Sequence, residues 1–270
     1  MKTILITGSS SGYGHATAQY FLERGWNVVA TMRTPKAGVL PASDRLCLVA
    51  LDVTVRPSID AAVREAIAAF GGIDVVVSNA GIGLFSAFEA TPDETVREIF
   101  ETNTFGVMNV ARAVIPHFRE RRAGLLINVT SSVAILPMPL VAPYCASKTA
   151  VEGFSESLAY EMAVFGAGVK IVEPGYGPGT SFTANGAARM EGLLPEAYAA
   201  YAQQLFADLG KGKTTAPSDV AATVWLAATD GSRRLRYAAG ADAEELAEMR
   251  RAMPGEGYLT QARAMMAPKA

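Results

Sequence analysis

Six short apolar segments recur along the first two thirds of the chain, and stretches with helical periodicity fill the gaps between them. Few polar residues interrupt these segments, so none has an obvious solvent-facing side. Such strands are buried on both faces, and their alternation with helices predicts a parallel sheet in a doubly wound α/β fold. The predicted strands are 3–6, 28–31, 47–51, 73–77, 125–129 and 169–172.

Length and composition fit a single domain and exclude several classes of partner. Half of the 270 residues are hydrophobic, which allows a large core. The net charge is −2 and the cations are scattered, so nucleic acid is not an expected partner. Because no membrane-length apolar run or signal-peptide pattern is present, we expect no membrane partner and a cytoplasmic location. Cys47 and Cys145 lack ligand spacing, so we expect reduced thiols and no metal site.

The regular pattern ends after Pro174, which divides the predicted domain 1–270 into parts. Residues 1–174 contain the alternating strands and helices, whereas glycines and prolines interrupt the chain before a helix over about 195–209. Insertions after a strand's carboxyl end lie where open α/β sheets bind ligands, so we predict a helical lid over 175–215. A plain surface loop is the alternative. Residues 216–270 are predicted to form a helix, a strand near 234–238, a charged helix and a tail.

A tyrosine and a lysine stand one helical turn apart, and a serine ends the strand-like segment upstream. Tyr144 and Lys148 would lie on one helix face, where the ammonium lowers the pKa of the phenol toward neutrality. With Ser131 as a second donor, Tyr144 could protonate an oxygen that gains negative charge, as a ketone oxygen does on receiving hydride. The alternative is an ordinary surface pair.

A glycine-rich turn over residues 7–14 joins the first strand to a helix predicted over about 14–24. Glycines permit a tight turn and close approach to a pyrophosphate, whose charge a helix N-terminus stabilises. The turn lacks the Gly-Lys-Ser/Thr of a P-loop, and a tight connection without a ligand is the alternative. The predicted dinucleotide contacts here are Gly8, Ser10, Ser11, Gly12, Tyr13 and Gly14.

The end of the second strand favours NADP over NAD. Met32 stands where an acid would bind the ribose hydroxyls of NAD, and Arg33 follows it. A guanidinium can bind the 2′-phosphate of NADP, and no carboxylate repels that phosphate. Asp52, with Val53, could contact the adenine edge. Arg33 could equally be a solvated loop charge, and Asp52 a turn or helix-capping residue.

Together these motifs resemble the short-chain dehydrogenase/reductase family over about residues 3–240. The family's glycine motif corresponds to residues 7–14, and its asparagine motif to Asn79, Ala80 and Gly81. The catalytic set of the family corresponds to Asn103, Ser131, Tyr144 and Lys148; the spacing of thirteen positions before the tyrosine selects Ser131 over Ser132. The resemblance implies a Rossmann-type fold, a nicotinamide cofactor and hydride transfer.

The resemblance also implies a role for each matched residue. Tyr144 is the acid/base, Ser131 polarises the carbonyl, and Lys148 holds the nicotinamide ribose while lowering the pKa of Tyr144. The backbone carbonyl near Asn103 keeps a water that links Lys148 to solvent. Residues 79–81 form a backbone cradle for the cofactor.

One implied cofactor contact departs from the family pattern. Pro174 and Gly175 match the segment that flanks the nicotinamide amide. The family threonine four positions past that glycine is Gly179 here, which leaves Thr180 as a candidate for the contact.

The leading interpretation is an NADP(H)-dependent carbonyl reductase, or the reverse alcohol dehydrogenase, acting on a small or medium apolar ketone, aldehyde or secondary alcohol. Phe85, Phe88, Met138 and Tyr176 are expected in the core or in a pocket wall, and as a pocket wall they would indicate an apolar substrate. One alternative is a regulator or scaffold that senses cofactor occupancy without turnover. Another is a steroid, retinoid or sugar dehydrogenase of the same fold. The resemblance further implies a homodimer or homotetramer that pairs through the helices carrying Asn103 and Tyr144.

Overall fold

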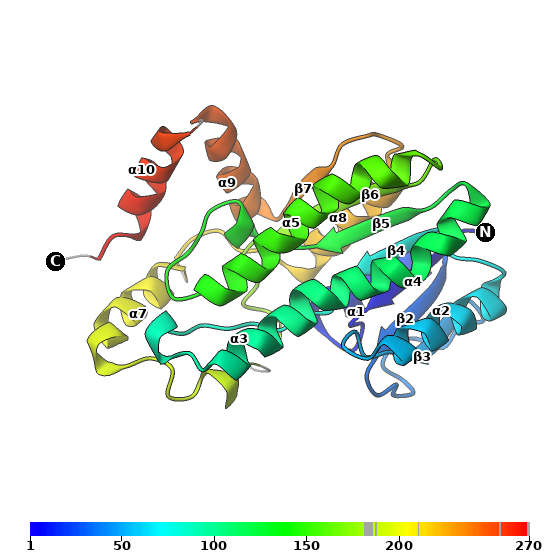
Figure 1. Cartoon of the computed structure of the whole chain (residues 1–270), viewed down its shortest axis with the longest axis horizontal. Helices are drawn as coiled ribbons and strands as arrows, with labels where there is room; N and C mark the ends of the chain where they lie inside the picture. Colours follow the sequence, from blue (N-terminus) through cyan, green and yellow to red (C-terminus); the bar gives the residue numbers. More distant parts are fainter. Residues whose placement is uncertain (181–185, 187, 210, 254, 269–270) are drawn as a thin grey trace.

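The sheet is the centre of the molecule. The computed structural model describes residues 1–180, 186, 188–209, 211–253 and 255–268. Within these residues, seven parallel strands form one sheet in the order β3-β2-β1-β4-β5-β6-β7 (Figure 1). The strands are β1 Thr3–Thr7, β2 Asn27–Met32, β3 Leu46–Ala50, β4 Val75–Ser78, β5 Leu125–Val129, β6 Gly168–Pro174 and β7 Arg236–Ala239. The predicted doubly wound α/β class is therefore confirmed.

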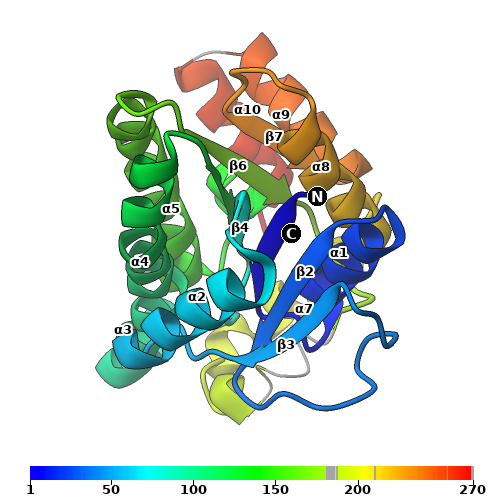
Figure 2. The ribbon, with the colours of Figure 1, turned by 90° about the vertical axis from the view of Figure 1, so that its right-hand side faces the viewer.

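Helices cover both faces of the sheet. Figure 2 shows α2, α4 and α5 on one side and α1 and α8 on the other. These five helices are α1 Gly12–Glu23, α2 Arg56–Phe70, α4 Gly106–Arg121, α5 Ala142–Ala163 and α8 Pro217–Thr229. Further helical elements are η1 Phe88–Ala90, α3 Asp93–Phe100, η2 Glu101–Phe105, η3 Ser132–Ala134, α7 Glu196–Leu209, α9 Ala241–Ala252 and α10 Glu256–Met266. In the part of the chain described here, no helix has both the length and the apolarity needed to cross a bilayer.

Alternate side chains of each central strand enter two separate cores. In β1, Leu5 packs with residues of α2, α4 and α5, whereas Ile4 and Ile6 pack with Phe21 of α1 and Val224 of α8. Successive residues of a strand point to opposite faces. Burial on both faces therefore explains why the strands lack an alternating polar pattern, and each fully buried Leu or Ile contributes about 1.5–3 kcal/mol.

The strand order reverses beside β1, and this reversal defines a ligand-binding position. The chain leaves β1 through α1 to reach β2 on one side, whereas β4 pairs with β1 on the other side. The connections after β1 and β4 therefore diverge to opposite faces. Open α/β sheets bind ligands in the crevice at such a point. The glycine turn and residues 79–81 both follow strands that end there.

Two buried carboxyl groups share one arginine at the β6–β7 side of the sheet. Arg236 Nη1 donates to Glu152 of α5 and, at 3.2 Å, to Glu173 of β6. Thr130 Oγ1 donates to the other oxygen of Glu152 at 3.0 Å. Burial, reinforced by the charge of Glu152, raises the pKa of Glu173 well above the usual glutamate value. Between the usual glutamate pKa and this raised value, the folded protein therefore holds a proton on Glu173 that the unfolded chain releases.

Glu173→Gln should change how stability depends on pH. A carboxyl whose pKa is raised by folding stabilises the protein at low pH, and this stabilisation is lost as pH rises from about 4.3 toward the raised value. Glutamine does not titrate, so the free energy of unfolding of the variant should increase relative to the parent between about pH 5 and about pH 8. Urea denaturation at both pH values measures the difference.

The matched control is Glu156→Gln, which removes a largely exposed carboxylate that also bonds Arg236. Its effect on the free energy of unfolding should be small, because an exposed ion pair contributes little to stability. A constant difference between Glu173→Gln and the parent across the pH range would contradict the raised pKa.

Candidate active site

The turns that follow β1 and β4 are joined by hydrogen bonds. Thr7 Oγ1 accepts from the backbone N–H groups of Asn79 at 2.9 Å and Ala80 at 3.0 Å. Asn79 Nδ2 donates to the carbonyl oxygens of Thr7 at 2.9 Å and Gly8 at 3.2 Å. A Cβ atom at Gly14 would lie 2.3 Å from Gly8 O and 2.5 Å from Asn79 Nδ2. The backbone approach at this point therefore requires glycine.

The glycine turn also fits a pyrophosphate. Gly8 and Gly12 have φ values of +73° and +57°, which favour glycine. Helix α1 starts at Gly12 with no acidic residue in its first turn, and among the described residues the Ser11 side chain makes no capping bond. Its first N–H groups and its dipole therefore remain suited to an anion. The exposed Ser10 and Ser11 side chains border this position.

Three further predicted cofactor residues follow β2 and β3. Arg33 is exposed directly after β2, and no acidic residue occurs at the end of that strand. Asp52 Oδ1 accepts from Thr54 N at 2.9 Å and Thr54 Oγ1 at 2.7 Å, so Asp52 has the turn role considered as its alternative. Val53 is buried against Gly106 of α4. An adenine contact by Asp52 or Val53 stays a prediction.

Ser131, Tyr144 and Lys148 come together beyond the carboxyl end of β5. Tyr144 and Lys148 both lie in the first two turns of α5, and Ser131 caps η3 by accepting from Val133 N at 3.3 Å. Ser131 also hydrogen-bonds to the Tyr144 hydroxyl. Lys148 Nζ donates to Val129 O at 3.0 Å and lies 6.0 Å from the centre of the Tyr144 ring. A phenol, a hydroxyl and an amine thus occupy one small region.

The protonation of this cluster differs from the sequence-based expectation. Burial raises the pKa of Tyr144 to about 12, although a hydrogen bond from Ser131 lowers it in part. Burial lowers the pKa of Lys148 to about 8, against the opposing charge of Glu152. The prediction that Lys148 brings the phenol toward neutrality is therefore wrong for this structure. The amine points to the Val129 carbonyl, and with a pKa of about 8 it stays mostly protonated at neutral pH. Because the pKa of Tyr144 is about 12, Tyr144 also keeps its proton at neutral pH.

Asn103 lies in η2, a π-helical turn between α3 and α4, and its side chain holds the chain beyond β4. Its Oδ1 accepts from Ile82 N at 2.8 Å, and its Nδ2 donates to Ile82 O at 2.9 Å and Ser147 Oγ at 3.2 Å. A Cβ atom on Gly81 would lie 3.2 Å from Asn103 Oδ1 and 3.4 Å from Lys148 Nζ. Asn103 therefore fixes the backbone next to the lysine. The predicted water on its backbone carbonyl is untested.

The segment after β6 depends on a residue that the sequence pattern did not reveal. Asp242, at the start of α9, accepts from Tyr176 N and from Thr215 Oγ1, both at 2.6 Å, and lies against Gly175. Its carboxylate thus joins the two ends of the predicted lid 175–215. An acidic residue in the first turn of the helix after β7 was the available signal, but sequence alone gave it no partner.

Pro174 and Thr180 lie at the two ends of this glycine-rich segment. Pro174 ends β6 next to Gly175. Thr180 Oγ1 donates to Gly177 O at 2.9 Å, and a Cβ atom on Gly12 would lie 3.6 Å from Thr180 Cβ. Tyr13 belongs to the glycine turn, and its hydroxyl lies against Gly177. The segment therefore faces the dinucleotide turn, while a carboxamide contact by Thr180 stays a prediction.

Apolar side chains from the predicted lid pack around Tyr144. Met190 and Leu193 belong to one cluster with Tyr144, and Phe85 and Met138 belong to a second. Phe206 of α7 packs on Phe85 with ring centroids 4.4 Å apart. The expectation for Phe88 is wrong, because it is 68% exposed in η1. The surroundings of the phenol are therefore apolar on the lid side.

A charged pair joins Arg189, within the predicted lid, to Glu98 of α3. Arg189 donates from Nε and Nη2 to the two carboxylate oxygens of Glu98, at 2.8 and 2.6 Å. These bonds lower the pKa of Glu98, and the positive charge of Arg33 lowers it further. Residues 181–185 and 187 of the predicted lid lie outside the described residues.

Comparison with known proteins agrees with this geometry. A family model described as short chain dehydrogenase matches residues 2–190. An uncharacterized oxidoreductase of Schizosaccharomyces pombe is 41% identical over 215 residues, which cover 77% of this chain and 88% of that protein. The 3beta-hydroxysteroid dehydrogenase 1 of Eggerthella lenta is 35% identical over 240 residues, which cover 86% of this chain and 88% of that protein.

Solved structures show the same fold with either dinucleotide. A short-chain dehydrogenase from Streptomyces avermitilis is 34% identical with a TM-score of 0.78, covering 98% of this chain and 94% of that chain. A 3-ketoacyl-(acyl-carrier-protein) reductase from Brucella melitensis complexed with NADH is 27% identical with a TM-score of 0.73, covering 88% of this chain and 96% of that chain. A short chain dehydrogenase from Burkholderia cenocepacia in complex with NADP is 25% identical, with a TM-score of 0.77 and coverages of 100% and 100%.

Gly14→Ala should damage the dinucleotide turn. The added methyl would overlap Gly8 O and Asn79 Nδ2, so the turn must shift, and stability should fall by about 1–3 kcal/mol. NADPH binding, followed by its fluorescence, should weaken strongly. The control is Gly153→Ala in α5, where a Cβ atom meets nothing within 4 Å. That variant should bind NADPH normally and gain about 0.5–1 kcal/mol; equal binding by the two variants would contradict the close approach.

Proposed function

Because the chain belongs to the short-chain dehydrogenase family of oxidoreductases, we propose that it is an NADP(H)-dependent carbonyl reductase or alcohol dehydrogenase. Its substrate is a small or medium apolar ketone, aldehyde or secondary alcohol. The observation that carries this proposal is the meeting of Ser131, Tyr144 and Lys148 beside the backbone of Gly81. A proton donor thus lies next to a turn whose shape fits a dinucleotide.

The three side chains divide the acid–base work. The nicotinamide, when bound, supplies or accepts the hydride. Tyr144 holds a proton at its Oη and delivers it to the substrate oxygen, while the Ser131 hydroxyl hydrogen-bonds to the same oxygen as negative charge develops. Lys148 holds the ribose next to Gly81. Because the pKa of Tyr144 is raised to about 12, its proton is in place at neutral pH, which supports the reducing direction.

The choice of NADP(H) rests on the end of β2. Arg33 is exposed where a 2′-phosphate would lie in this fold, and β2 ends without an acid that would repel the phosphate. The other cofactor residues proposed are Gly8, Ser10, Ser11, Gly12, Tyr13, Gly14, Asp52, Val53, Asn79, Ala80, Gly81, Tyr144, Lys148, Pro174, Gly175 and Thr180.

The wall near Tyr144 supports an apolar substrate. Met190, Leu193, Phe85 and Met138 surround the phenol, and among these side chains none carries a charge. A hydroxysteroid or ketosteroid is a second candidate, because this wall suits a sterol skeleton and a relative carries the name 3beta-hydroxysteroid dehydrogenase 1. A panel of 2-octanone, acetophenone, benzaldehyde and a 3-ketosteroid, followed by NADPH absorbance, separates these classes. Binding of NADPH without consumption for any compound would favour the regulator instead.

Tyr144→Phe should remove the proton donor and little else. Turnover with the best panel substrate should fall by about a hundredfold or more, while NADPH affinity stays nearly unchanged. Tyr160→Phe is the control, since Tyr160 lies on the same helix and is 82% exposed. Undiminished turnover in Tyr144→Phe would refute the assignment of the acid.

Arg33→Asp should shift the cofactor preference toward NADH. Replacing a phosphate-binding cation with a carboxylate should change the NADPH/NADH ratio of kcat/KM by about tenfold or more. Arg45→Asp is the control, because Arg45 is exposed at the amino end of β3, away from the turns. A ratio equal to that of the parent would show that Arg33 does not contact the phosphate.

A further inference from the structure

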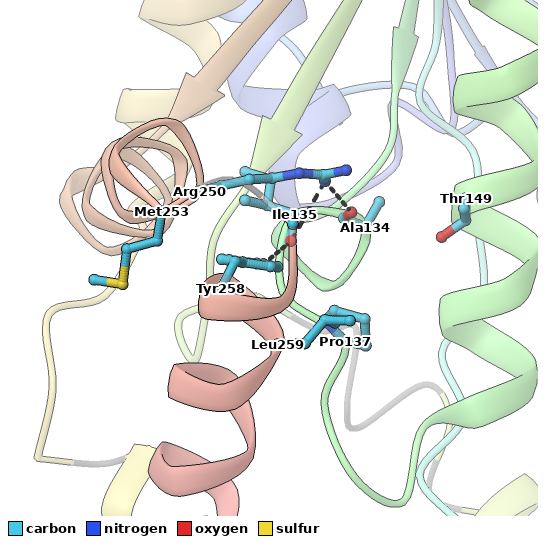
Figure 3. Close-up of a pocket in the computed structure, with 9 residues that line it drawn as sticks. Ala134, Ile135, Pro137, Thr149, Arg250, Met253, Tyr258 and Leu259 are labelled. Carbon is cyan, nitrogen blue, oxygen red and sulfur yellow. Dashed lines mark hydrogen bonds between the residues drawn. The ribbon is translucent and has the colours of Figure 1, made fainter.

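The loop after Ser131 includes residues 133–135. The carbonyl groups of these three residues accept hydrogen bonds from side chains outside the loop. The Val133 carbonyl accepts from Cys145 Sγ of α5 at 3.2 Å. The Ala134 carbonyl accepts from Arg250 Nη1 of α9 at 3.0 Å, and the Ile135 carbonyl accepts from Tyr258 Oη of α10 (Figure 3). The catalytic helix therefore binds the first carbonyl, and the C-terminal helices bind the next two.

Hydrogen bonds within the loop connect these peptide groups to Ser131. Ala134 N donates to Ser131 O at 3.0 Å, and Ile135 N donates to Ser132 O at 2.9 Å. The Ser131 side chain in turn accepts from Val133 N. A shift of the Ala134 or Ile135 peptide is therefore transmitted to the serine through one tight turn.

The Tyr258 side chain is buried, although it lies in α10, the last helix among the described residues. It is 7% exposed and packs with Leu136, which follows the loop, and with Ala262. The end of α10 is also joined to the lid helix α7, where Gln204 Nε2 donates to Ala267 O at 3.1 Å and Tyr201 Oη donates to Met266 O. The α9–α10 hairpin thus contacts both the loop of Ser131 and the lid.

A pocket lies beside these contacts. Its volume is about 490 Å³, and it lies between the hairpin and α5, with Thr149 on one wall and Ala134, Ile135 and Pro137 on another (Figure 3). Arg250 and Tyr258 border the same space. Ala134 and Ile135 are themselves buried, so packing supports the loop, and Arg250 and Tyr258 add the hydrogen bonds that fix its two carbonyl groups.

We propose that Tyr258 and Arg250 are positioning residues that hold the Ser131 hydroxyl where it can bind the substrate oxygen. This inference rests on the proposed function, because it acts through Ser131. It assigns the C-terminal helices, which lie beyond the matched family region 2–190, a part in the reaction.

A double-mutant cycle tests whether the two residues act through the serine. Tyr258→Phe and Arg250→Met are each made in the parent and in Ser131→Ala, and kcat and KM are measured with NADPH and the best panel ketone. In the parent, each substitution should lower kcat by about tenfold, since small displacements of reacting groups reduce turnover strongly. In Ser131→Ala, the same substitutions should change kcat by less than about twofold, because their target is absent.

Controls separate positioning from general damage. Arg250→Lys keeps a donor and should recover most of the loss seen in Arg250→Met. Arg251→Met alters the neighbouring exposed arginine of α9 and should leave kcat at the parent value. NADPH affinity should be the same in all of these variants. If Tyr258→Phe does not fold, the Arg250 variants give the same test.

Two results would overturn the inference, and they can be told apart. If Ser131→Ala lowers kcat but the Tyr258 and Arg250 substitutions lower it by the same factor in both backgrounds, these residues only support the fold. If Ser131→Ala leaves kcat unchanged, the proposed catalytic role of the serine fails, and this inference fails with it.

Discussion

Burial of the sheet on both faces is the constraint on which the rest of this structure depends. Because Ile4 and Ile6 enter one core and Leu5 the other, no face of the central strands is left for polar chemistry. Polar groups gather instead at the carboxyl ends of the strands. There the reversal between β1 and β4 brings Thr7 and Asn79 together, and the phenol, amine and hydroxyl follow on β5 and α5. Burial of both sheet faces therefore determines the fold and also the position of the polar site at the strand ends.

The electrostatics of the site differ from a simple cation–phenol pair. The Lys148 ammonium is desolvated and donates to the Val129 carbonyl, so burial determines the pKa values of both groups. Burial favours the neutral form of each group, so the phenol keeps its proton, whereas Lys148, with a pKa of about 8, binds its own proton less tightly than usual but is still mostly protonated at neutral pH. A protonated phenol is the state that a reductase requires before hydride arrives. The apolar residues packed with Tyr144 contribute to this burial and at the same time suit an apolar substrate.

Sequence predicted local features well and long-range ones poorly. The strands and α1 were predicted to within a few residues, because apolar runs, glycine turns and helical periodicity are local signals. The clustering of Ser131, Tyr144 and Lys148 followed from motif spacing. The pKa of Tyr144 was predicted in the wrong direction, because it is dominated by burial, which depends on how distant parts of the chain pack around the phenol. The contacts of Asp242 and Tyr258 span the fold, so no local pattern could indicate them.

The central claim is that a proton-donating phenol lies beside a dinucleotide site. A crystal structure of the protein with NADP⁺ tests it most directly. The account predicts the pyrophosphate against the glycine turn and the N-terminus of α1, the 2′-phosphate at Arg33, and the nicotinamide next to Tyr144 Oη and Ser131 Oγ. A nicotinamide bound away from Tyr144, or a dinucleotide that does not contact the glycine turn, would contradict it.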